Sequence, residues 1–313
     1  MTEIKQIFKK LLIFFVIVIL LDYGMGMILK KCYFAQKDGY DYRTTYVLDS
    51  VRSDMLVIGS SMASHHYNPA ILDSTFHLST FNGGRDGCNI FYYYGVLKSV
   101  LKRYHPKVIV MDMMPDEFET RPMSYQRVSI LLPYYDSHPE LKPICELKSS
   151  YEKFKLLSKI YPYNSKLLSA ITAVLHIKQG EKGIEGYLPL SSTLKGREPV
   201  EILKNDMDTV KVAYFKKFVD DCNKAGVKLM VTISPIYVKY NTASKSISVA
   251  RQICSNSRVP FLDYSHDASY SECLFADPYH LNKSGANLFT RRFAVDIKHM
   301  MPRGQSQYSF LNK

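Results

Sequence analysis

The sequence lacks the features that mark several large classes of protein. Only one stretch, residues 11–29, is apolar enough to cross a bilayer, which excludes a multi-span transporter. There is no CxxC pair and no His–Cys cluster with zinc-ligand spacing, so we expect no metal and no cofactor. There is also no dense Lys/Arg run and no RNA-binding aromatic signature, and we therefore expect no nucleic-acid partner.

The composition is that of a folded globular protein with an excess of positive charge. Hydrophobic residues make up 46% and charged residues 22% of the 313 positions. Lysine and arginine number 41 against 29 acidic residues, a net charge of +12 that favours anionic partners such as phospholipid or acidic polymers. The six cysteines permit disulfides outside the cytoplasm, but free buried thiols fit their spacing equally well.

The apolar stretch reads LLIFFVIVILLDYGMGMIL, and only Asp22 interrupts it. Its 19 residues are enough to span a hydrocarbon core of about 30 Å. A cleaved signal peptide needs a small-x-small site, which residues 24–26 supply poorly, and lysines precede Cys32 where a lipoprotein has small residues. We expect residues 1–31 to be an uncleaved membrane anchor that contacts the lipid bilayer through residues 11–29, with a buried helix of a soluble protein as the alternative. Lysines flank the stretch on both sides and leave its orientation open.

Short apolar runs follow at regular intervals, at residues 55–58, 108–111, 227–233 and 259–262, with a weaker one at 77–81. Continuous runs of this kind are typical of strands that are buried on both faces of a parallel sheet. Apolar residues at helical spacing predict helices over 89–104, 206–223 and 284–300. The alternation of strands and helices predicts an α/β fold with a doubly wound, five-stranded parallel sheet.

The other segments suggest a division of the chain. The polar, Tyr-rich residues 32–52 are expected to form a stalk that leads to a domain over residues 53–301, followed by a tail at 302–313. Residues 118–203 contain several Pro and Tyr residues and lack the regularly spaced apolar runs of the predicted strands. We therefore predict a mostly helical insertion there. Because ligands bind beyond the carboxyl ends of parallel strands, we expect this insertion to cap the site or carry substrate, with structural padding as the alternative.

Two motifs carry residues that suit nucleophilic catalysis. Ser61 follows the first predicted strand in the run Gly59-Ser60-Ser61, where a serine at a helix N-terminus can act as a nucleophile, although serine is also a common helix cap. Asp277 and His280 lie three residues apart ahead of the last helix. A carboxylate so placed can hold one imidazole nitrogen and leave the other to take a proton from a hydroxyl group. A capping Asp and a surface His are the alternative.

A glycine-rich run, NGGRDG at residues 82–87, follows the second predicted strand. Glycines let the backbone approach a ligand, so an N–H group here can donate into an oxyanion hole; an ordinary turn is the alternative. The run is no nucleotide-binding fingerprint, because it follows the second strand and its spacing differs.

The three blocks together resemble the SGNH/GDSL hydrolase family. The matching segments are VIGSSMASHHYNP, NGGRDG and DPYHLNKSGA, and the resemblance covers residues 54–117 and 204–300. The anchor makes the chain look most like the extracytoplasmic branch, which includes the D-alanyl-transfer protein of teichoic acids and the alginate acetylation proteins. The resemblance implies a flavodoxin-like three-layer α/β/α sandwich, a Ser-His-Asp triad, and a single-pass protein of the cell membrane whose domain lies on the periplasmic or outer face.

Carried over to this sequence, the resemblance implies Ser61 as nucleophile, His280 as base and Asp277 as the partner that orients the base. The backbone N–H groups of Ser61 and Gly87 are implied as oxyanion donors.

One departure concerns the third block of the family, which supplies an Asn donor. Its place falls near Asp116, and a carboxylate there repels an oxyanion. Asn82 or Asn89 is expected to substitute for it, with Asn82 the first choice. We expect His65 and Asp116 to contact substrate. Asp112 with Asp116 and Glu117 also suggests paired carboxylates for glycoside hydrolysis, which nothing else in the sequence supports.

The sequence therefore predicts a membrane-anchored serine esterase or O-acyltransferase that acts on O-acyl (acetyl) esters of a cell-envelope polysaccharide. A membrane-bound O-acyltransferase is the implied partner for the transferase. The alternative is a catalytically degenerate glycan-binding or polysaccharide-assembly component on the same scaffold, which Asp116 in the place of Asn favours.

Overall fold

The computed structural model describes residues 2–166, 172, 183–196, 200–201, 206–239 and 244–300. The chain divides into two compact units: Met1–Tyr42 with Val128–Gly180, and Arg43–Arg127 with Glu181–Lys313. This division runs through the predicted insertion at 118–203, of which residues 128–180 group with the N-terminal helix. The predicted tail at 302–313 lies outside the described residues.

The second unit is built on the predicted five-stranded parallel sheet. Its strands are β1 (Met55–Gly59), β2 (Thr80–Asn82), β3 (Val108–Asp112), β5 (Lys228–Ile233) and β7 (Phe261–Asp263). Their order is β2-β1-β3-β5-β7, and every neighbouring pair is parallel. Every residue of β1 and β3 is buried, which explains why their sequences are apolar throughout instead of alternating.

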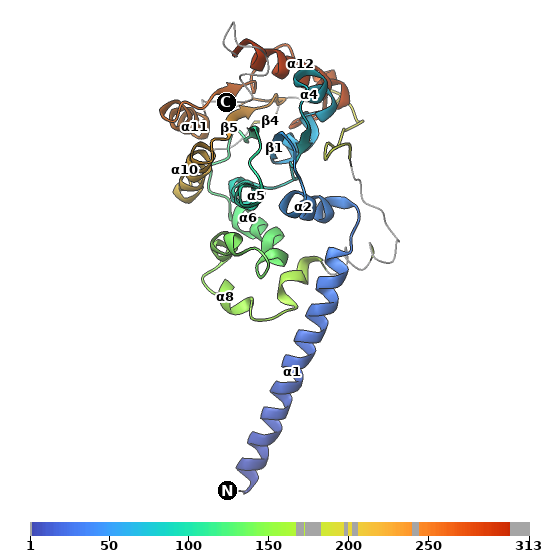
Figure 1. Cartoon of the computed structure of the whole chain (residues 1–313), viewed down its shortest axis with the longest axis vertical. Coiled ribbons are helices and arrows are strands. Elements are labelled where there is room, and N and C mark those ends of the chain that lie inside the picture. Colours follow the sequence, from blue (N-terminus) through green and yellow to red (C-terminus); the bar gives the residue numbers. More distant parts are fainter. Residues whose placement is uncertain are drawn as a thin grey trace. The chain divides into compact units, whose positions relative to one another are not determined.

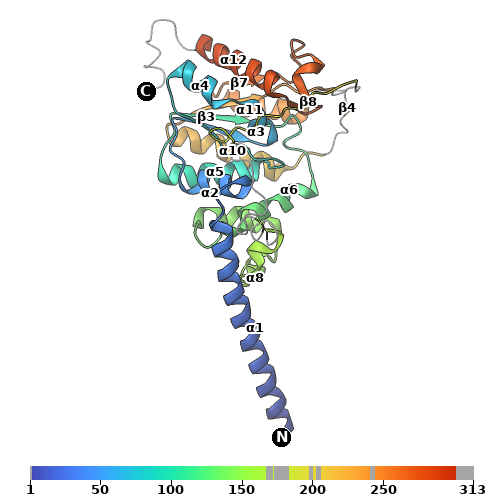
Figure 2. The ribbon, with the colours of Figure 1, turned by 90° about the vertical axis from the view of Figure 1, so that its right-hand side faces the viewer.

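Helices cover both faces of this sheet, as the sandwich prediction requires. On one face lie α3 (Ser61–His66), α4 (Pro69–Phe76) and α12 (Lys283–Met300), and α12 packs on the other two. The opposite side carries α5 (Ile90–Arg103), α10 (Thr209–Lys224) and α11 (Lys245–Asn256), with α10 packed on both. Figure 2 shows α4 and α12 above the sheet and α5 and α10 below it. The fold class predicted from the sequence is therefore confirmed.

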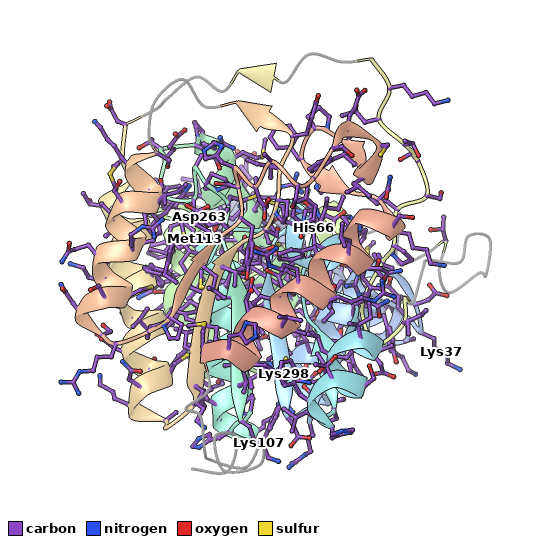
Figure 3. All side chains as sticks on the ribbon, turned by 90° about the horizontal axis from the view of Figure 1, so that it is seen from above. Lys37, His66, Lys107, Met113, Asp263 and Lys298 are labelled. Carbon is purple, nitrogen blue, oxygen red and sulfur yellow. The ribbon has the colours of Figure 1, made fainter. Side chains whose placement is uncertain are left out.

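Short elements complete the second unit. They are α6 (Pro122–Gln126), the bridge pair β4 (Val200–Glu201) with β6 (Val238–Lys239), the turn η5 (Glu272–Leu274), and the hairpin β8 (Phe275–Asp277) with β9 (His280–Leu281). Figure 3 looks down onto the face of the sheet: Lys107, just before β3, lies at one end of the strands, and His66, Met113 and Asp263 lie towards the other. That other end is the carboxyl edge, where an open parallel sheet binds ligands.

The first unit is formed by α1 (Thr2–Phe34) and a set of short helices. These are η1 (Arg127–Tyr134), η2 (Pro139–Leu141), α7 (Lys142–Cys145), η3 (Glu146–Lys148), α8 (Glu152–Lys155) and η4 (Tyr161–Lys166). Among the described residues, α1 alone is long and apolar enough to cross a membrane, as a membrane anchor or a signal sequence would be. Its side chains are exposed from Glu3 to Leu21, and beyond that point some of them, such as Leu29 and Tyr33, are buried. Figure 1 shows α1 as one long helix.

Instead of the predicted stalk at 32–52, the chain forms the end of α1 and then α2 (Gly39–Asp49), whose Val47 and Leu48 are buried. All six cysteines lie in the described part of the chain and are free thiols; Cys88, Cys145, Cys222 and Cys254 are buried.

Candidate active site

The site begins at the sharp turn between β1 and α3. Gly59 ends the strand, and a Cβ atom there would lie 2.5 Å from the Asp112 carbonyl oxygen and 2.7 Å from the Ala63 Cβ, so only glycine fits. Ser60 then caps α3 by accepting a hydrogen bond from the Met62 N–H group at 3.3 Å. Ser61 is therefore the first residue of a helix that starts at the carboxyl edge of the sheet.

The β8–β9 hairpin supplies the two partners of Ser61. Asp277 and His280 lie opposite each other across this hairpin, and Pro278 and Tyr279 form the turn between them. Side chains directly opposite on antiparallel strands are neighbours, which brings the carboxylate to the imidazole. The Tyr237 N–H group donates to the Pro278 carbonyl oxygen at 2.8 Å and holds the turn from outside.

The three side chains form a continuous hydrogen-bonded chain. His280 Nδ1 lies 2.9 Å from each Asp277 carboxylate oxygen, and His280 Nε2 lies 2.7 Å from Ser61 Oγ. Partial burial acts to raise the pKa of Asp277, but the hydrogen bond and charge of His280 and two backbone N–H groups outweigh it and lower that pKa. With Asp277 ionised, Nδ1 carries the proton and donates it to the carboxylate, and Nε2 accepts the Ser61 hydroxyl.

A cavity of about 210 Å³ opens beside Ser61. It is lined by Ser60, Ser61, Gly87, Cys88, Asn89, Met114, Asp116, Glu117, Arg121, Met123, Ser124, Arg127 and Lys211. Within the described part of the chain, neither the Ser61 nor the Gly87 N–H group donates to a protein acceptor. Both predicted oxyanion donors thus lie at this cavity with their N–H groups available.

The backbone conformation at Gly87 favours glycine, and the side chain of Arg127 packs close to it. The φ of +69° at Gly87 lies in the left-handed region that side chains disfavour. A Cβ atom there would also lie 3.0–3.3 Å from the guanidinium group of Arg127, which packs on the α-carbon of Gly87. The glycine therefore makes room for a cation beside a candidate oxyanion donor.

The structure corrects the prediction that Asn82 donates to an oxyanion. Asn82 is fully buried, and its two amide hydrogens go to the carbonyl oxygens of Ala63 and Tyr67, at 2.7 and 2.9 Å. These carbonyls belong to the last turn and C-cap of α3, where helix geometry leaves acceptors unsatisfied. Asn82 therefore supports the helix that carries Ser61 and has no donor left for a ligand.

Asn89 is the side-chain amide that does line the cavity. Its oxygen caps α5 by accepting from the Phe91 N–H group at 3.0 Å, and its nitrogen donates to the Ser124 carbonyl at 3.1 Å. An amide nitrogen has two hydrogens, so one remains for a ligand.

The acidic residues near the cavity are paired with other groups of the protein or buried. Asp116 lines the cavity, as its predicted substrate contact requires, but it forms an ion pair with Arg121. Its negative charge is therefore largely neutralised, which weakens the case for a degenerate site. Burial raises the pKa of Glu117 to about 7, and its carboxyl accepts the Ile90 N–H group at 2.7 Å. Asp112 is fully buried, so it cannot pair with either residue for glycoside hydrolysis.

The structure also corrects the prediction that His65 contacts substrate. His65 is buried, its Nδ1 lies 2.6 Å from the Leu188 carbonyl oxygen, and its Nε2 lies 3.1 Å from Asp86. It does not line the cavity. Burial acts to lower the pKa of His65, but the hydrogen bond and charge of Asp86 outweigh it and raise that pKa.

Replacing His65 with Gln is expected to destabilise the protein most at low pH. Because its folded-state pKa is raised, the protonated His65 contributes stability in full below about pH 6.5, the unfolded pKa, and loses it as pH rises through the folded pKa. We expect His65→Gln to lower the free energy of unfolding by about 1–2 kcal/mol at pH 6. This is the loss expected for a hydrogen bond between charged groups, reduced because solvent at Asp86 screens the interaction. The loss should shrink towards pH 9 in denaturant titrations; a loss that grows with pH would contradict this assignment.

A second chain of polar groups, which the sequence analysis missed, supports the base from behind. His66 is fully buried, and its Nε2 accepts the Leu281 N–H group at 2.9 Å, so its Nδ1 carries the proton and donates to Ser234 Oγ at 2.8 Å. Ser234 Oγ donates in turn to Asp112 at 2.8 Å. Burial lowers the pKa of His66 far below its usual value, which keeps it neutral in this role. His66 thereby fixes the strand that carries His280.

No family model matches the chain, and no curated protein matches it. A candidate lipolytic protein of the G-D-S-L family from Desulfitobacterium hafniense DCB-2 has a similar solved structure, with 11% sequence identity and a TM-score of 0.38 over 77% of this chain and 97% of that chain. Among the described residues, no group of three or more His, Cys, Asp or Glu is arranged to hold a metal ion. The assignment of site residues rests on the distances given above.

Proposed function

We propose that this protein is an SGNH-type serine esterase or O-acyltransferase. The observation that carries the proposal is the chain of contacts from Asp277 through His280 to Ser61, with 2.9 Å at the first step and 2.7 Å at the second. A serine at a helix N-terminus with an oriented imidazole on its hydroxyl is an arrangement suited to acyl transfer. Two backbone N–H groups at the adjoining cavity suit the oxyanion that such a reaction forms.

The reaction follows from these positions. Ser61 Oγ attacks the carbonyl carbon of an ester while His280 Nε2 takes its proton, and Asp277 stabilises the imidazolium that forms. The negative oxygen of the tetrahedral intermediate accepts the N–H groups of Ser61 and Gly87 and the second amide hydrogen of Asn89. The carbon–oxygen bond of the leaving alcohol then breaks, and His280 returns the proton to that alcohol. Water or a sugar hydroxyl, deprotonated by His280, next attacks the acyl-serine and releases Ser61.

The charges of the cavity support a substrate that is itself anionic. Arg121 pairs with Asp116, and Lys211 donates to the Glu119 carbonyl oxygen at 2.7 Å. Arg127 is exposed, and its guanidinium group makes no hydrogen bond or ion pair within the described part of the chain. Its planar guanidinium suits bidentate binding of a carboxylate or phosphate. We propose O-acyl esters of an acidic cell-envelope polysaccharide as the substrate class.

Arg127→Gln is expected to discriminate between charged and neutral esters. We expect kcat/KM to fall by about 10- to 100-fold for an O-acetylated methyl glucuronide, since a hydrogen bond to a charged group is lost. For the neutral O-acetylated methyl glucoside the fall should stay below about threefold. Arg251→Gln, which breaks an exposed ion pair with Asp263, is the matched control. An equal fall for both sugars would contradict an anion-binding role of Arg127.

The N-terminal helix supports the location that we propose. The exposed apolar side chains of α1 before Asp22 suit a single-pass membrane anchor. The family resemblance, and not the lysines that flank the stretch, is the basis for proposing that the enzyme domain lies on the periplasmic or outer face. A transferase in that place needs acyl groups from the other side of the membrane, which a membrane-bound O-acyltransferase would supply.

Fluorophosphonate labelling tests the proposed nucleophile. In the full chain we expect one covalent adduct on the peptide that contains Ser61, with no adduct in Ser61→Ala. Ser74→Ala, in the next helix, should label like the wild type because Ser74 is exposed and its hydroxyl donates to the Ile71 carbonyl oxygen, with no imidazole among its partners in the described part of the chain. A folded wild type without label, or with label on another residue, would contradict the proposal.

A further inference from the structure

Three large hydrophobic side chains are exposed together in the first unit. Tyr151 is 71% exposed, Phe154 is 71% exposed and Leu157 is 74% exposed. Among the described residues beyond α1, no large hydrophobic side chain is more exposed than these three. They lie within seven consecutive residues around α8. Such a cluster on a water-facing surface is unusual and marks a place that binds something apolar.

The backbone that carries this cluster is firmly held, so the exposure is built in. Between Tyr151 and Phe154, the side chain of Glu152 is fully buried. Its carboxylate accepts hydrogen bonds from Tyr161 at 2.6 Å and Ser149 at 2.7 Å. Burial acts to raise the pKa of Glu152, but these hydrogen bonds and the nearby Lys148 outweigh it and lower that pKa. A buried, fully bonded carboxylate turned inward leaves its apolar neighbours turned outward.

The cluster is joined directly to α1 by the residues that follow it. Ser158 Oγ donates to one Asp22 oxygen at 2.6 Å, and the Lys159 N–H group donates to the other at 2.7 Å. Gly26 contacts Lys159 so closely that a Cβ atom on it would lie 2.4 Å from the Lys159 Cβ. Leu157 therefore immediately precedes a segment that is fastened to α1 at Asp22 and Gly26. Figure 1 shows the short helices of this segment beside α1.

Asp22 and Gly26 set the depth of the cluster relative to a bilayer. The apolar stretch 11–29 includes both residues, and with a rise of 1.5 Å per residue its end lies about 10 Å beyond Asp22. If the whole stretch spans, residues 158–160 lie within the outer part of the hydrocarbon. If the span ends at Leu21, they lie at the headgroup level. In both cases the segment fastened to Asp22 lies close to the bilayer surface, and Tyr151, Phe154 and Leu157 precede it directly in the chain.

The charge of residues 142–166, which surround the cluster, also fits a lipid bilayer. Residues 142–166 contain six lysines and two glutamates and no other charged residue. Tyr and Phe at the boundary and lysines around them are the composition that membrane interfaces favour. Lysines near a membrane surface are attracted to anionic lipids.

We propose that Tyr151, Phe154 and Leu157 insert into the lipid bilayer beside α1, as a second, interfacial contact with the membrane. The inference rests on the proposed membrane anchoring of α1 and is independent of the chemistry at Ser61. In this arrangement the segment 151–160 also supplies hydrogen-bond donors to Asp22, a carboxylate within an apolar helix, where a charge needs partners.

The protein contains no tryptophan, so a single introduced Trp reports on one position. The full chain is reconstituted in vesicles of phosphatidylcholine and phosphatidylglycerol, with and without lipid brominated near the headgroup end of the acyl chain. Phe154→Trp tests the cluster and should fold, because one exposed aromatic replaces another. Val18→Trp on the exposed surface of α1 is the positive control, and Leu288→Trp on α12 is the negative control.

We expect the brominated lipid to quench roughly half of the emission of Phe154→Trp and Val18→Trp, and none of the emission of Leu288→Trp. Quenching of Val18→Trp without quenching of Phe154→Trp would overturn the interfacial contact and leave the anchor in place. An unquenched Val18→Trp would overturn the anchor, and the interfacial contact with it. Neither result bears on fluorophosphonate labelling of Ser61, so failure of this inference and of the proposed enzyme are distinguishable.

Discussion

Replacing Ser61 with Ala is expected to lower kcat for 4-nitrophenyl acetate by about 10⁴- to 10⁶-fold. Ser61 Oγ is the atom that bonds to the acyl carbon, and its hydroxyl proton is the one that His280 Nε2, 2.7 Å away, removes. The variant lacks both. The backbone N–H groups stay in place, so KM should change by less than about threefold. Initial rates over a range of substrate concentrations give both constants.

Two comparisons make this prediction specific. Ser74→Ala removes an exposed hydroxyl one helix further on and should retain wild-type rates within about twofold. His280→Ala should lose nearly as much activity as Ser61→Ala, and the double variant should lose no more than Ser61→Ala alone, since the two side chains act as one unit. Additive losses would mean that Ser61 and His280 act in separate steps.

Asp277→Asn is the second substitution with a large expected effect. The amide keeps the size of the carboxylate, but its NH₂ group can donate to His280 Nδ1 and so move the imidazole proton to Nε2. An Nε2–H group cannot accept the proton of Ser61, although the 2.7 Å separation is preserved. We expect kcat to fall by about 10³- to 10⁴-fold and labelling of Ser61 by fluorophosphonate to slow in parallel.

The matched control for this variant is Asp267→Asn. Asp267 lies on the same connection and accepts the Ser269 N–H group at 2.9 Å, but it is not near the imidazole chain. It should retain activity within about twofold. If Asp277→Asn also kept its activity, the carboxylate would serve the backbone N–H groups of Tyr279 and His280 and not the imidazole.

The sheet could be predicted because each buried strand has its own local signal. The runs at 55–58 and 108–111 are apolar at every position, since both faces of β1 and β3 are covered by helices. The Ser61, Gly87 and Asp277–His280 blocks could be placed at one edge because carboxyl ends of parallel strands meet there. The hairpin that opposes Asp277 to His280 was not predicted, since strands this short carry no pattern.

The contacts between distant side chains could not be predicted. Asn82 was expected at the oxyanion because it follows a strand, but a glycine-rich turn brings its amide to the orphan carbonyls at the end of α3. His66 and Ser234 are 168 residues apart, and no local pattern links them. The sequence also could not show which residues of α1 are exposed and which pack on the protein, because apolar side chains suit both lipid and a protein core.

The most direct test of the central claim is to identify the covalent intermediate. The full chain is mixed with 4-nitrophenyl acetate, quenched in acid within the first turnover and digested, and the peptides are examined by mass spectrometry. The acyl-transfer mechanism predicts a burst of 4-nitrophenolate and one acetyl group on Ser61, absent in Ser61→Ala and in His280→Ala. Release of 4-nitrophenolate with no acetyl group on the protein, or with the acetyl group on another residue, would contradict the role of Ser61 as nucleophile.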